Sequence, residues 1–370
     1  MKKTAIALAV AASTTGVGNV SATSMEDRMM AMEKSLRYLE QRVASQDEVI
    51  KEKDRQISEM AASSESSGGS WFNSVEIGGV VEVEANNVDA DGGSDESDIY
   101  VATVEIGVTA QVNDWTAAEI VLLYEDDGDS ELDVDTATIS IANPDSIWAL
   151  TTGQYTVPFG YYSTNLLSDP ITLDAAETGD SAVEFGIANN GFSASAYVFR
   201  GDQQSDIENY GFAFGYETET DDFAFSGGLG WINDIAESDT VVDDGTAMTN
   251  EAEAWTAFAQ LDIASFTFIG EYVAATDSLD AYNSSDKPSF FNIEAGYSFE
   301  AMGRPAVFAI GFQGSDDAAD YAGGMDKERT LAALSMEVMD GTSVTVEYAN
   351  AEDYAGDETD TLTGQLSVEF

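Results

Sequence analysis

The stretch Ser74–Glu84, SVEIGGVVEVE, shows the pattern that decides the fold of this chain. In an extended strand successive side chains point to opposite faces, so Val75 and Ile77 fall on one face and Glu76 and Glu82 on the other. The same period of two runs through residues 71–370, whereas a helix would need a period of about 3.6. The pattern therefore predicts a series of strands, each with one apolar and one polar face.

We predict sixteen such strands, joined alternately by short and long connections. In the second strand, Tyr100 and Val104 are expected on the same apolar face. Short turns such as Asn113-Asp114 alternate with long acidic loops such as 87–98, a rhythm that is typical of an outer-membrane barrel. The strands are expected near residues 74–86, 99–112, 115–126, 134–143, 146–156, 181–188, 192–200, 208–217, 222–232, 252–263, 266–275, 288–299, 305–314, 328–339, 342–350 and 360–370.

The predicted fold class is all-β, an antiparallel transmembrane β-barrel of about 16 strands preceded by a short α-helical coiled coil. A β-sandwich or a soluble β-helix would show the same alternation, with apolar faces packed inward and polar faces in water. The rhythm of the loops and the last residues favour the barrel. Leu366, Val368 and Phe370 alternate with polar residues, and this ending resembles the assembly signal of bacterial outer-membrane barrels, so the barrel-assembly machinery is an expected partner.

The composition changes near residue 65, so the two parts are interpreted separately. Residues 1–22 combine two lysines, a short apolar run and a small-x-small motif, which predicts a signal peptide. Residues 23–60 carry apolar side chains at 3,4 spacing, which predicts a periplasmic coiled-coil helix that joins copies of the chain as a trimer. An amphipathic helix lying on its own domain is the alternative. Residues 61–70 are expected to be a flexible linker, and 71–370 the outer-membrane barrel.

The charge balance excludes several classes of function. The 370 residues include 14 Lys and Arg, 69 Asp and Glu, and no His or Cys. Such negative charge repels the phosphates of nucleic acids, so no nucleic-acid partner is expected. Without His and Cys the chain lacks the usual general bases, thiol nucleophiles and zinc ligands. We predict no enzymatic activity, no cofactor and no specific metal site. The acidic segments 89–96 and 126–131 are expected to be solvated loops, and binding of Ca²⁺ or Mg²⁺ by their carboxylates is the alternative.

Carboxylates recur on the polar faces of the predicted strands. If the apolar faces meet lipid, these side chains line a lumen, where a ring of carboxylates favours cations over anions. The alternative is that they are only the wetted inner face of a barrel. The candidate pore-lining residues are Glu76, Glu82, Glu84, Glu105, Glu119, Glu184, Glu253, Glu271, Glu294 and Glu347.

The longest predicted connection, residues 157–180, is a candidate constriction loop. It leaves its strand at a Pro-Phe-Gly sequence, in which Pro and Gly supply turn geometry, and an ordinary strand-ending turn is the alternative. Inward folding of this loop would narrow the pore. Its candidate residues are Pro158, Phe159, Gly160, Asp169, Asp174 and Glu177.

The sequence GQYTVPFGYYSTN at 153–165, with SDPIT at 168–172, resembles the LbtU-type siderophore porin family. The similarity extends to AVEFG at 182–186, GFSASAYVF at 191–199, the first strand and the terminal Phe. It implies a sixteen-stranded barrel that imports iron–siderophore complexes without an N-terminal plug domain. Phosphate-selective porins carry a related element, but phosphate would need basic lumen residues that this chain lacks.

These observations predict a porin in the outer membrane of a Gram-negative bacterium, with its helix in the periplasm. The leading prediction is passive passage of small solutes such as iron–siderophore complexes. The alternatives are a general, cation-preferring diffusion porin and a structural tether between outer membrane and cell wall. Because an acidic pore repels anions, a transported siderophore complex is expected to be neutral or cationic.

Overall fold

The computed structural model describes residues 73–370, apart from 94, 127–131, 144, 202–206, 246, 247, 249, 280, 281 and 283–285. These residues belong to one compact unit, Trp71–Phe370. The predicted signal peptide, coiled coil and linker lie outside the described residues. No helix within the described part of the chain is long and apolar enough to cross a membrane.

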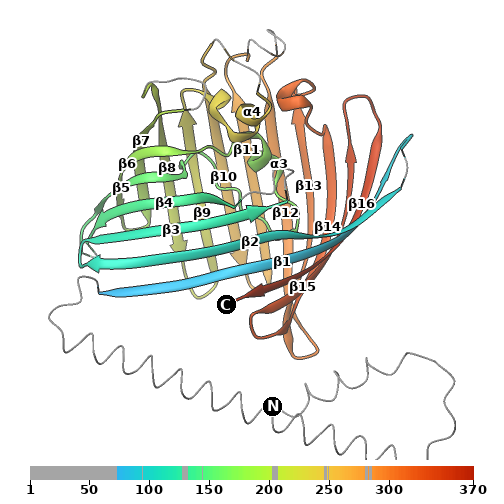
Figure 1. The fold of residues 1–370 in the computed structure, drawn as a ribbon, viewed down its shortest axis with the longest axis horizontal. Coiled ribbons are helices and arrows are strands. Elements are labelled where there is room, and N and C mark those ends of the chain that lie inside the picture. The colour runs from blue at the N-terminus through green and yellow to red at the C-terminus, as the bar shows by residue number, and fades with distance from the viewer. Residues whose placement is uncertain are drawn as a thin grey trace, which may run out of the picture. The chain divides into compact units, whose positions relative to one another are not determined.

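Sixteen antiparallel strands form one closed barrel, as the alternation of side chains predicts (Figure 1). Each strand pairs with its neighbours in sequence, and β1 pairs with β16, so that no strand edge is left open. The strands are β1 (Ser74–Ala90), β2 (Glu96–Asn113), β3 (Thr116–Glu125), β4 (Asp133–Ala142), β5 (Trp148–Thr156), β6 (Gly179–Asn189), β7 (Phe192–Phe199), β8 (Asn209–Glu219), β9 (Phe223–Ile232), β10 (Ala254–Ile263), β11 (Phe266–Ala275), β12 (Ser289–Ala301), β13 (Arg304–Asp316), β14 (Glu328–Met339), β15 (Thr342–Glu352) and β16 (Glu358–Glu369).

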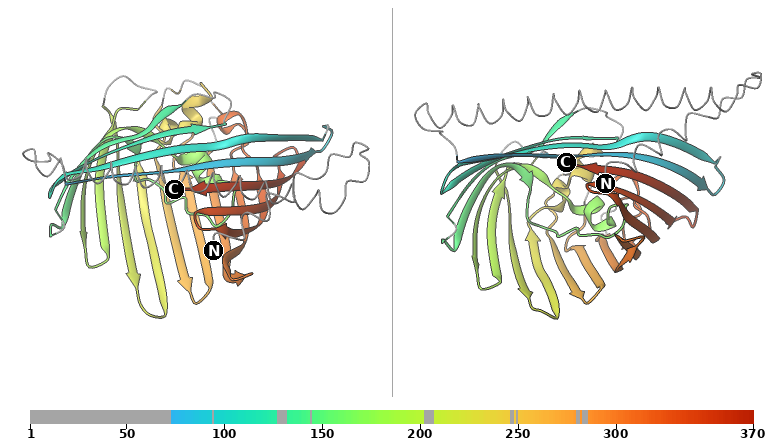
Figure 2. Two further views of the ribbon diagram at one scale, coloured as in Figure 1. Left: turned by 60° about the horizontal axis from the view of Figure 1, so that its bottom comes forward. Right: turned by 90° about the horizontal axis from the view of Figure 1, so that it is seen from below.

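The short helices of the described chain all lie in long connections between strands. They are α3 (Ile171–Ala176), η1 (Ile235–Glu237), α4 (Asp239–Asp243) and η2 (Tyr321–Gly323). Seen along the barrel in Figure 2 (right), α3 lies inside the ring of strands. The segment between β5 and β6 therefore folds into the barrel.

The barrel is closed by hydrogen bonds at its last residue. The N–H of Gly79 donates to the carbonyl of Phe370 at 3.0 Å, and the N–H of Phe370 donates to the carbonyl of Gly79 at 3.0 Å. The Phe370 ring lies against Gly79, where a Cβ would come within 3.0 Å of Cζ of the ring. Because Gly79 has no side chain, the ring can pack closely on β1.

The strand register decides which side chains face outward. Large apolar side chains are exposed on the outer face, for example Ile77 at 70% and Phe214 at 58%. The predicted outward position of Tyr100 is wrong, because the β1–β2 register shifts between Glu82 and Val83. One extra residue turns the rest of the strand over. Tyr100 consequently lies opposite Glu84 and donates a hydrogen bond of 2.7 Å to its carboxylate.

Aromatic side chains gather on the outer face near both ends of the strands. Towards the short turns, the rings of Phe192 and Tyr216 lie 4.6 Å apart and those of Trp148 and Phe185 lie 6.5 Å apart. Towards the long loops, Tyr210 and Trp231 are 5.6 Å apart, and Trp255 and Tyr272 are 5.3 Å apart. The outer face thus carries two aromatic bands, separated by aliphatic and aromatic residues of the strand centres.

Part of the inner face is apolar rather than wetted. Near the long-loop rim, inward-facing residues of several strands pack with the long connections into one buried cluster. The expectation of a polar inner face is wrong in this region, because the inward-folded connections supply apolar partners. The members on strands include Tyr197, Phe199, Ile232, Val273 and Phe290, and those on connections include Val157, Phe159, Ile171, Val241, Leu279 and Tyr321.

Candidate functional site: the inward loop and the inner wall

The inward loop comprises residues 157–178, between the end of β5 and the start of β6. Its two ends are joined, because the N–H of Val157 donates to the carbonyl of Thr178 at 2.9 Å. At the Pro-Phe-Gly turn, Phe159 is only 2% exposed and packs in the buried cluster inside the barrel. The turn thus directs the chain into the lumen.

Two glycines of the inner wall leave room for this loop. A Cβ on Gly230 would fall on the carbonyl oxygen of Phe159, and a Cβ on Gly311 would lie 2.5 Å from Cδ1 of Leu166. A glycine inside a strand commonly marks a place where another chain segment approaches closely. Both glycines therefore belong to the seat of the loop.

Glu271 on β11 binds the first part of the loop. Its carboxylate accepts hydrogen bonds from the backbone N–H groups of Tyr161 at 2.7 Å and Tyr162 at 3.1 Å. The hydroxyl of Thr172 donates a third at 3.0 Å. A single wall carboxylate thus satisfies two consecutive backbone donors of the loop.

Glu294 on β12 binds the next part of the loop in the same way. It accepts from the N–H of Asn165 at 2.8 Å and from the hydroxyl of Thr164 at 2.8 Å. The side-chain amide of Asn292 on the same strand donates a further hydrogen bond of 3.0 Å. Glu294 is 2% exposed, so these donors take the place of water around its charge.

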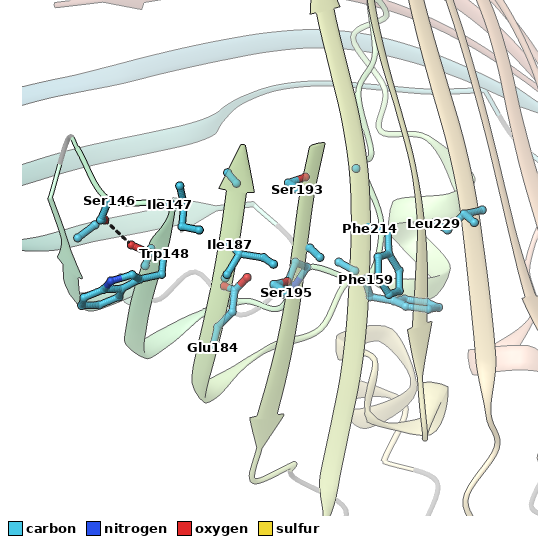
Figure 3. Close-up of a pocket in the computed structure, with 18 of the residues that line it drawn as sticks. Ser146, Ile147, Trp148, Phe159, Glu184, Ile187, Ser193, Ser195, Phe214 and Leu229 are labelled. Carbon is cyan, nitrogen blue, oxygen red and sulfur yellow. Dashed lines mark hydrogen bonds between the residues drawn. The ribbon is translucent and has the colours of Figure 1, made fainter. Parts of the chain in front are cut away.

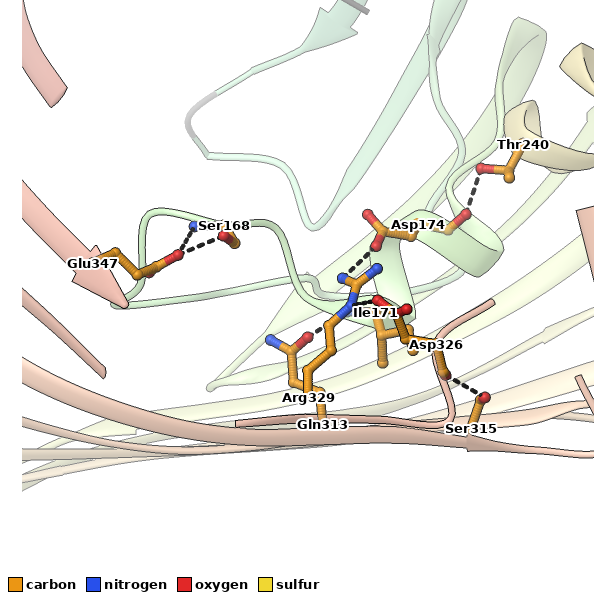
Figure 4. A network of polar contacts seen from close by, with 9 residues as sticks. All are labelled: Ser168, Ile171, Asp174, Thr240, Gln313, Ser315, Asp326, Arg329 and Glu347. Carbon is orange, nitrogen blue, oxygen red and sulfur yellow. Dashed lines mark hydrogen bonds and ion pairs between the residues drawn. The ribbon is translucent and has the colours of Figure 1, made fainter. Parts of the chain in front are cut away.

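Glu347 on β15 binds the part of the loop that reaches farthest across the barrel (Figure 4). It accepts from the N–H groups of Leu167 at 2.6 Å and Ser168 at 3.0 Å, and from the Ser168 hydroxyl. The loop then turns back, and the N–H of Ile171 donates to Oε1 of Gln313 at 3.1 Å. We call Glu271, Glu294 and Glu347 the clamp glutamates.

The clamp glutamates differ from the predicted free charges of a pore wall. A buried carboxylate is costly unless it is hydrogen-bonded, and hydrogen bonds to a charged acceptor contribute about 1.5–3 kcal/mol each. Here the donors are backbone N–H groups of the loop, which would otherwise be unsatisfied inside the barrel. These three residues face inward as predicted, but they hold the loop on the wall.

An ion-pair network binds α3 to the wall (Figure 4). Nη1 of Arg329 on β14 lies 2.7 Å from Oδ2 of Asp174, and its Nε lies 2.6 Å from Oδ2 of Asp326. The backbone carbonyl of Asp174 also accepts a hydrogen bond from the hydroxyl of Thr240 in α4. One basic residue of the inner wall is thus neutralised by two acids.

Other candidate glutamates remain in contact with water on the inner face. Ile106 and Ile120, the residues that follow Glu105 and Glu119, are exposed on the outer face. Because successive side chains of a strand point to opposite faces, the two glutamates point inward. Glu253 does not fit the prediction. It is exposed and lies one residue before β10, two residues before Trp255, whose side chain faces outward. The inward-facing candidates outside the clamp are Glu76, Glu82, Glu84, Glu105, Glu119 and Glu184.

The remaining candidate residues of the loop have different environments. Pro158 and Gly160 border a recess of the inner wall. Glu177 accepts a hydrogen bond of 3.1 Å from the hydroxyl of Thr156. Asp169 is exposed to the lumen, yet enclosure by protein raises its pKa to about 6, with the negative charge of Asp174 contributing. Burial also raises the pKa values of Asp174 and Glu177 above their ordinary range.

Polar space remains on both sides of the loop where it crosses towards β15. One recess of about 370 Å³ lies between residues 164–167 and the wall, with Glu82 and hydroxyl-bearing side chains of β14–β16 in its lining. Another of about 290 Å³ lies beside Ser168, Arg329 and the threonines of β16. The loop therefore narrows the lumen on the side of β14–β16 and leaves polar space there.

The residues that hold the loop were largely missed from sequence. Gln313, Arg329 and the wall glycines carry no motif, and their roles depend on partners far along the chain, 142 residues away for Gln313 and 155 for Arg329. Glycine at inward positions of otherwise regular strands is the one signal that could have indicated a close approach. Within the described residues, no group of three or more acidic side chains is arranged to hold a metal ion.

Comparison with known proteins gives distant relatives and a clear fold. No family model matches the chain. It is 26% identical over 285 residues to a UPF0422 protein of Coxiella burnetii, covering 71% of this chain and 61% of that protein. It is 25% identical over 297 residues to a UPF0422 protein of Legionella pneumophila strain Paris, covering 70% and 55%. The chain thus spans 55–61% of the length of these relatives.

Solved porins share the architecture. An anion-selective porin from Comamonas acidovorans has a TM-score of 0.58 at 14% identity, over 80% of this chain and 99% of that one. OprB of Pseudomonas putida has a TM-score of 0.58 at 7% identity, over 80% and 94%. OmpF of Salmonella typhi, solved in complex with daunomycin, has a TM-score of 0.56 at 13% identity, over 81% and 98%. The fold is that of a porin. The resemblance to siderophore porins stays a prediction.

Proposed function

We propose that the protein is an outer-membrane porin that gives small solutes passive passage and prefers cations. The observation that carries this proposal is the inward loop, which crosses the lumen of a closed barrel while unclamped carboxylates line the wall beside it. Glu82, Glu105 and Glu119 face the interior without being buried. A narrowed, acid-lined passage attracts cations and repels anions.

The outer face supports a location in a membrane. Water would meet large apolar side chains there, at a cost of about 25 cal/mol for each Å² of apolar surface. Two aromatic bands flank this surface, as in barrels whose girdles lie at the two lipid–water interfaces. We infer that the lipid of the outer membrane of a Gram-negative bacterium covers the apolar surface.

The charge of the barrel supports cation preference. Residues 71–370 contain 59 acidic and five basic residues. Arg329, a base of the inner wall, is paired with Asp174 and Asp326 and so adds little net positive field to the lumen. The clamp glutamates bind neutral N–H and hydroxyl groups, which bring no positive charge into the barrel. The field inside the barrel is therefore negative.

A narrower form of the proposal is passage of neutral or cationic iron–siderophore complexes. Of the residues that carry the siderophore porin resemblance, 157–165 and 168–172 form most of the inward loop, and 153–156 end β5. Residues 164–168 border the open recesses and would meet a passing solute, so a shared loop favours a shared solute class. Growth of a deletion strain under iron limitation tests this form. Unchanged siderophore uptake after deletion would remove it and leave the general porin.

Residues 1–70 are expected to act in processing and oligomerisation. We propose that residues 1–22 are removed and that 23–60 joins copies as a trimer in the periplasm. Deletion of 23–60 is expected to yield monomers that still conduct, measured by chemical cross-linking and by bilayer recording. If the deletion variant still forms trimers, the contact between subunits lies on the barrel. If the deletion abolishes only attachment to the cell wall, the segment acts as a structural tether.

The function itself is tested by recording from the purified full-length protein in planar bilayers. Stepwise, ohmic conductance is expected, because the inward loop leaves polar space on both sides. Protein that inserts into the bilayer as a folded barrel without any conductance would contradict the proposal.

A further inference from the structure

A recess of about 430 Å³ lies beside the inward loop, on the side of the short turns (Figure 3). The turn 158–160 forms one side of it, and the inner faces of β5–β8 form the other. A volume of this size is typical of sites that hold a small organic molecule. The inward-facing wall residues are small, namely Ala149, Gly186, Ala188, Ser193, Ser195, Ala213 and Gly215.

The recess contains a single carboxylate, Glu184 on β6. Its neighbours Val183 and Phe185 are exposed on the outer face, so the Glu184 side chain points inward. It is half-buried, and no hydrogen bond or ion pair engages its carboxylate in the described part of the chain. Unlike the clamp glutamates, Glu184 therefore has a charge available to a ligand.

An aromatic ring lies across the recess from β5 and β6. Phe258 on β10 stacks on Tyr161 of the inward loop, with ring centroids 4.4 Å apart and planes at 4°. Gly228 lets the ring lie against the wall, since a Cβ there would come within 2.6 Å of Cε1 of Phe258. The loop and the wall together fix the orientation of this ring.

We propose that this recess is a binding subsite for a small organic cation, with an amine or quaternary ammonium group against Glu184 and an apolar body along the small wall residues and Phe258. One carboxylate among apolar and hydroxyl side chains suits an organic cation better than a metal ion, which would need several oxygen ligands. The aromatic ring adds attraction for a cation or for a flat apolar body. The inference rests on the proposed function, because the ligand must enter the lumen, and it names a solute class for that pore.

The test uses benzyltrimethylammonium, with tetramethylammonium and benzyl alcohol as comparators that lack the ring or the charge. Binding to the detergent-solubilised full-length protein is measured by titration calorimetry, and block of potassium current is measured in bilayers. Glu184→Gln should weaken binding of benzyltrimethylammonium roughly tenfold, as expected for loss of one charged contact. Ala213→Leu, which fills the recess and keeps the charge, should weaken it as well. Both comparators should bind more weakly than the probe.

Glu119→Gln is the matched control, because it removes an inward carboxylate of β3 outside the recess. Equal binding by wild type and Glu184→Gln, or equal weakening by Glu119→Gln, would overturn the subsite. If the protein does not conduct, the proposed function fails, while calorimetry still decides the subsite. If it conducts with cation preference and Glu184→Gln leaves binding unchanged, the subsite alone fails.

Discussion

Glu347 accepts hydrogen bonds from two consecutive backbone N–H groups, whereas Glu105 faces the same lumen without a clamp role. Both glutamates lie at strand positions whose side chains alternate towards the barrel interior, so the sequence pattern predicts the same inward orientation for both. Their difference arises from what covers them. The inward loop lies over β11, β12 and β15, and its N–H groups need acceptors where water is excluded.

Glu347→Gln and Glu105→Gln form a matched pair. The first replaces an acceptor oxygen by an NH₂ group that faces a backbone donor, at a cost of about 1.5–3 kcal/mol, so the loop should loosen and single-channel conductance should rise. The second should lower cation preference and leave conductance steps uniform. Single-channel recording with reversal potentials distinguishes them. Identical behaviour of the two variants would contradict the clamp.

Gly230 and Gly311 allow a second matched comparison. An added methyl group at Gly230 meets backbone, the Phe159 carbonyl, whereas at Gly311 it meets the end of the flexible Leu166 side chain. Gly230→Ala should therefore displace the loop and lower the unfolding temperature more than Gly311→Ala, with an overpacking cost of about 1–3 kcal/mol. Thermal unfolding and limited proteolysis of the loop measure the difference. A milder effect at Gly230 would show that the loop is seated elsewhere.

Asp169 should give the conductance a pH dependence. Its pKa is raised to about 6, so its charge is lost as the pH falls through that value, while an ordinary aspartate would keep it. Cation preference should therefore decrease between about pH 7 and pH 5, and Asp169→Asn should remove much of this change. By linkage, the folded state gains stability as the pH falls through this window. A reversal potential that does not change between pH 7 and pH 5 would exclude this role.

The inward loop is the element that the sequence describes least completely. Its length and its Pro-Phe-Gly turn predict a special connection, but its path depends on acceptors supplied by strands far along the chain. Asp174 and Arg329 are 155 residues apart and meet only because α3 packs on β11–β13, next to β14. The strands could be predicted because they repeat a local period, whereas the seat of the loop has no local signal apart from glycines.

A double-mutant cycle tests the ion pair between α3 and the wall. Arg329→Gln leaves Asp174 enclosed without its partner, so that its pKa, already raised by burial, should rise further because Arg329 no longer lowers it. The double variant should disturb α3 less than the sum of the effects of Arg329→Gln and Asp174→Asn. The expected coupling is about 0.5–3 kcal/mol. Additive effects on proteolysis of the loop would show that the pair contributes nothing to its position.

At the scale of the whole molecule, the closed barrel, its sixteen strands and its outward apolar face follow from periodicity. Periodicity does not predict that one part of the interior is packed with apolar side chains while another part stays open and polar. Tyr197, Phe199 and Phe290 look from sequence like ordinary strand residues, yet they form a buried cluster with the inward-folded connections. The passage is thereby displaced towards β14–β16 and β1, where Glu82 and Glu84 lie.

The central claim is that the inward loop leaves an acid-lined, cation-preferring passage. The reversal potential of the full-length protein in a KCl gradient across a planar bilayer tests it most directly. The dilute side should become positive, because potassium passes more readily than chloride, and Glu82→Gln combined with Glu105→Gln should reduce this potential. A potential of opposite sign, showing chloride preference, would contradict it.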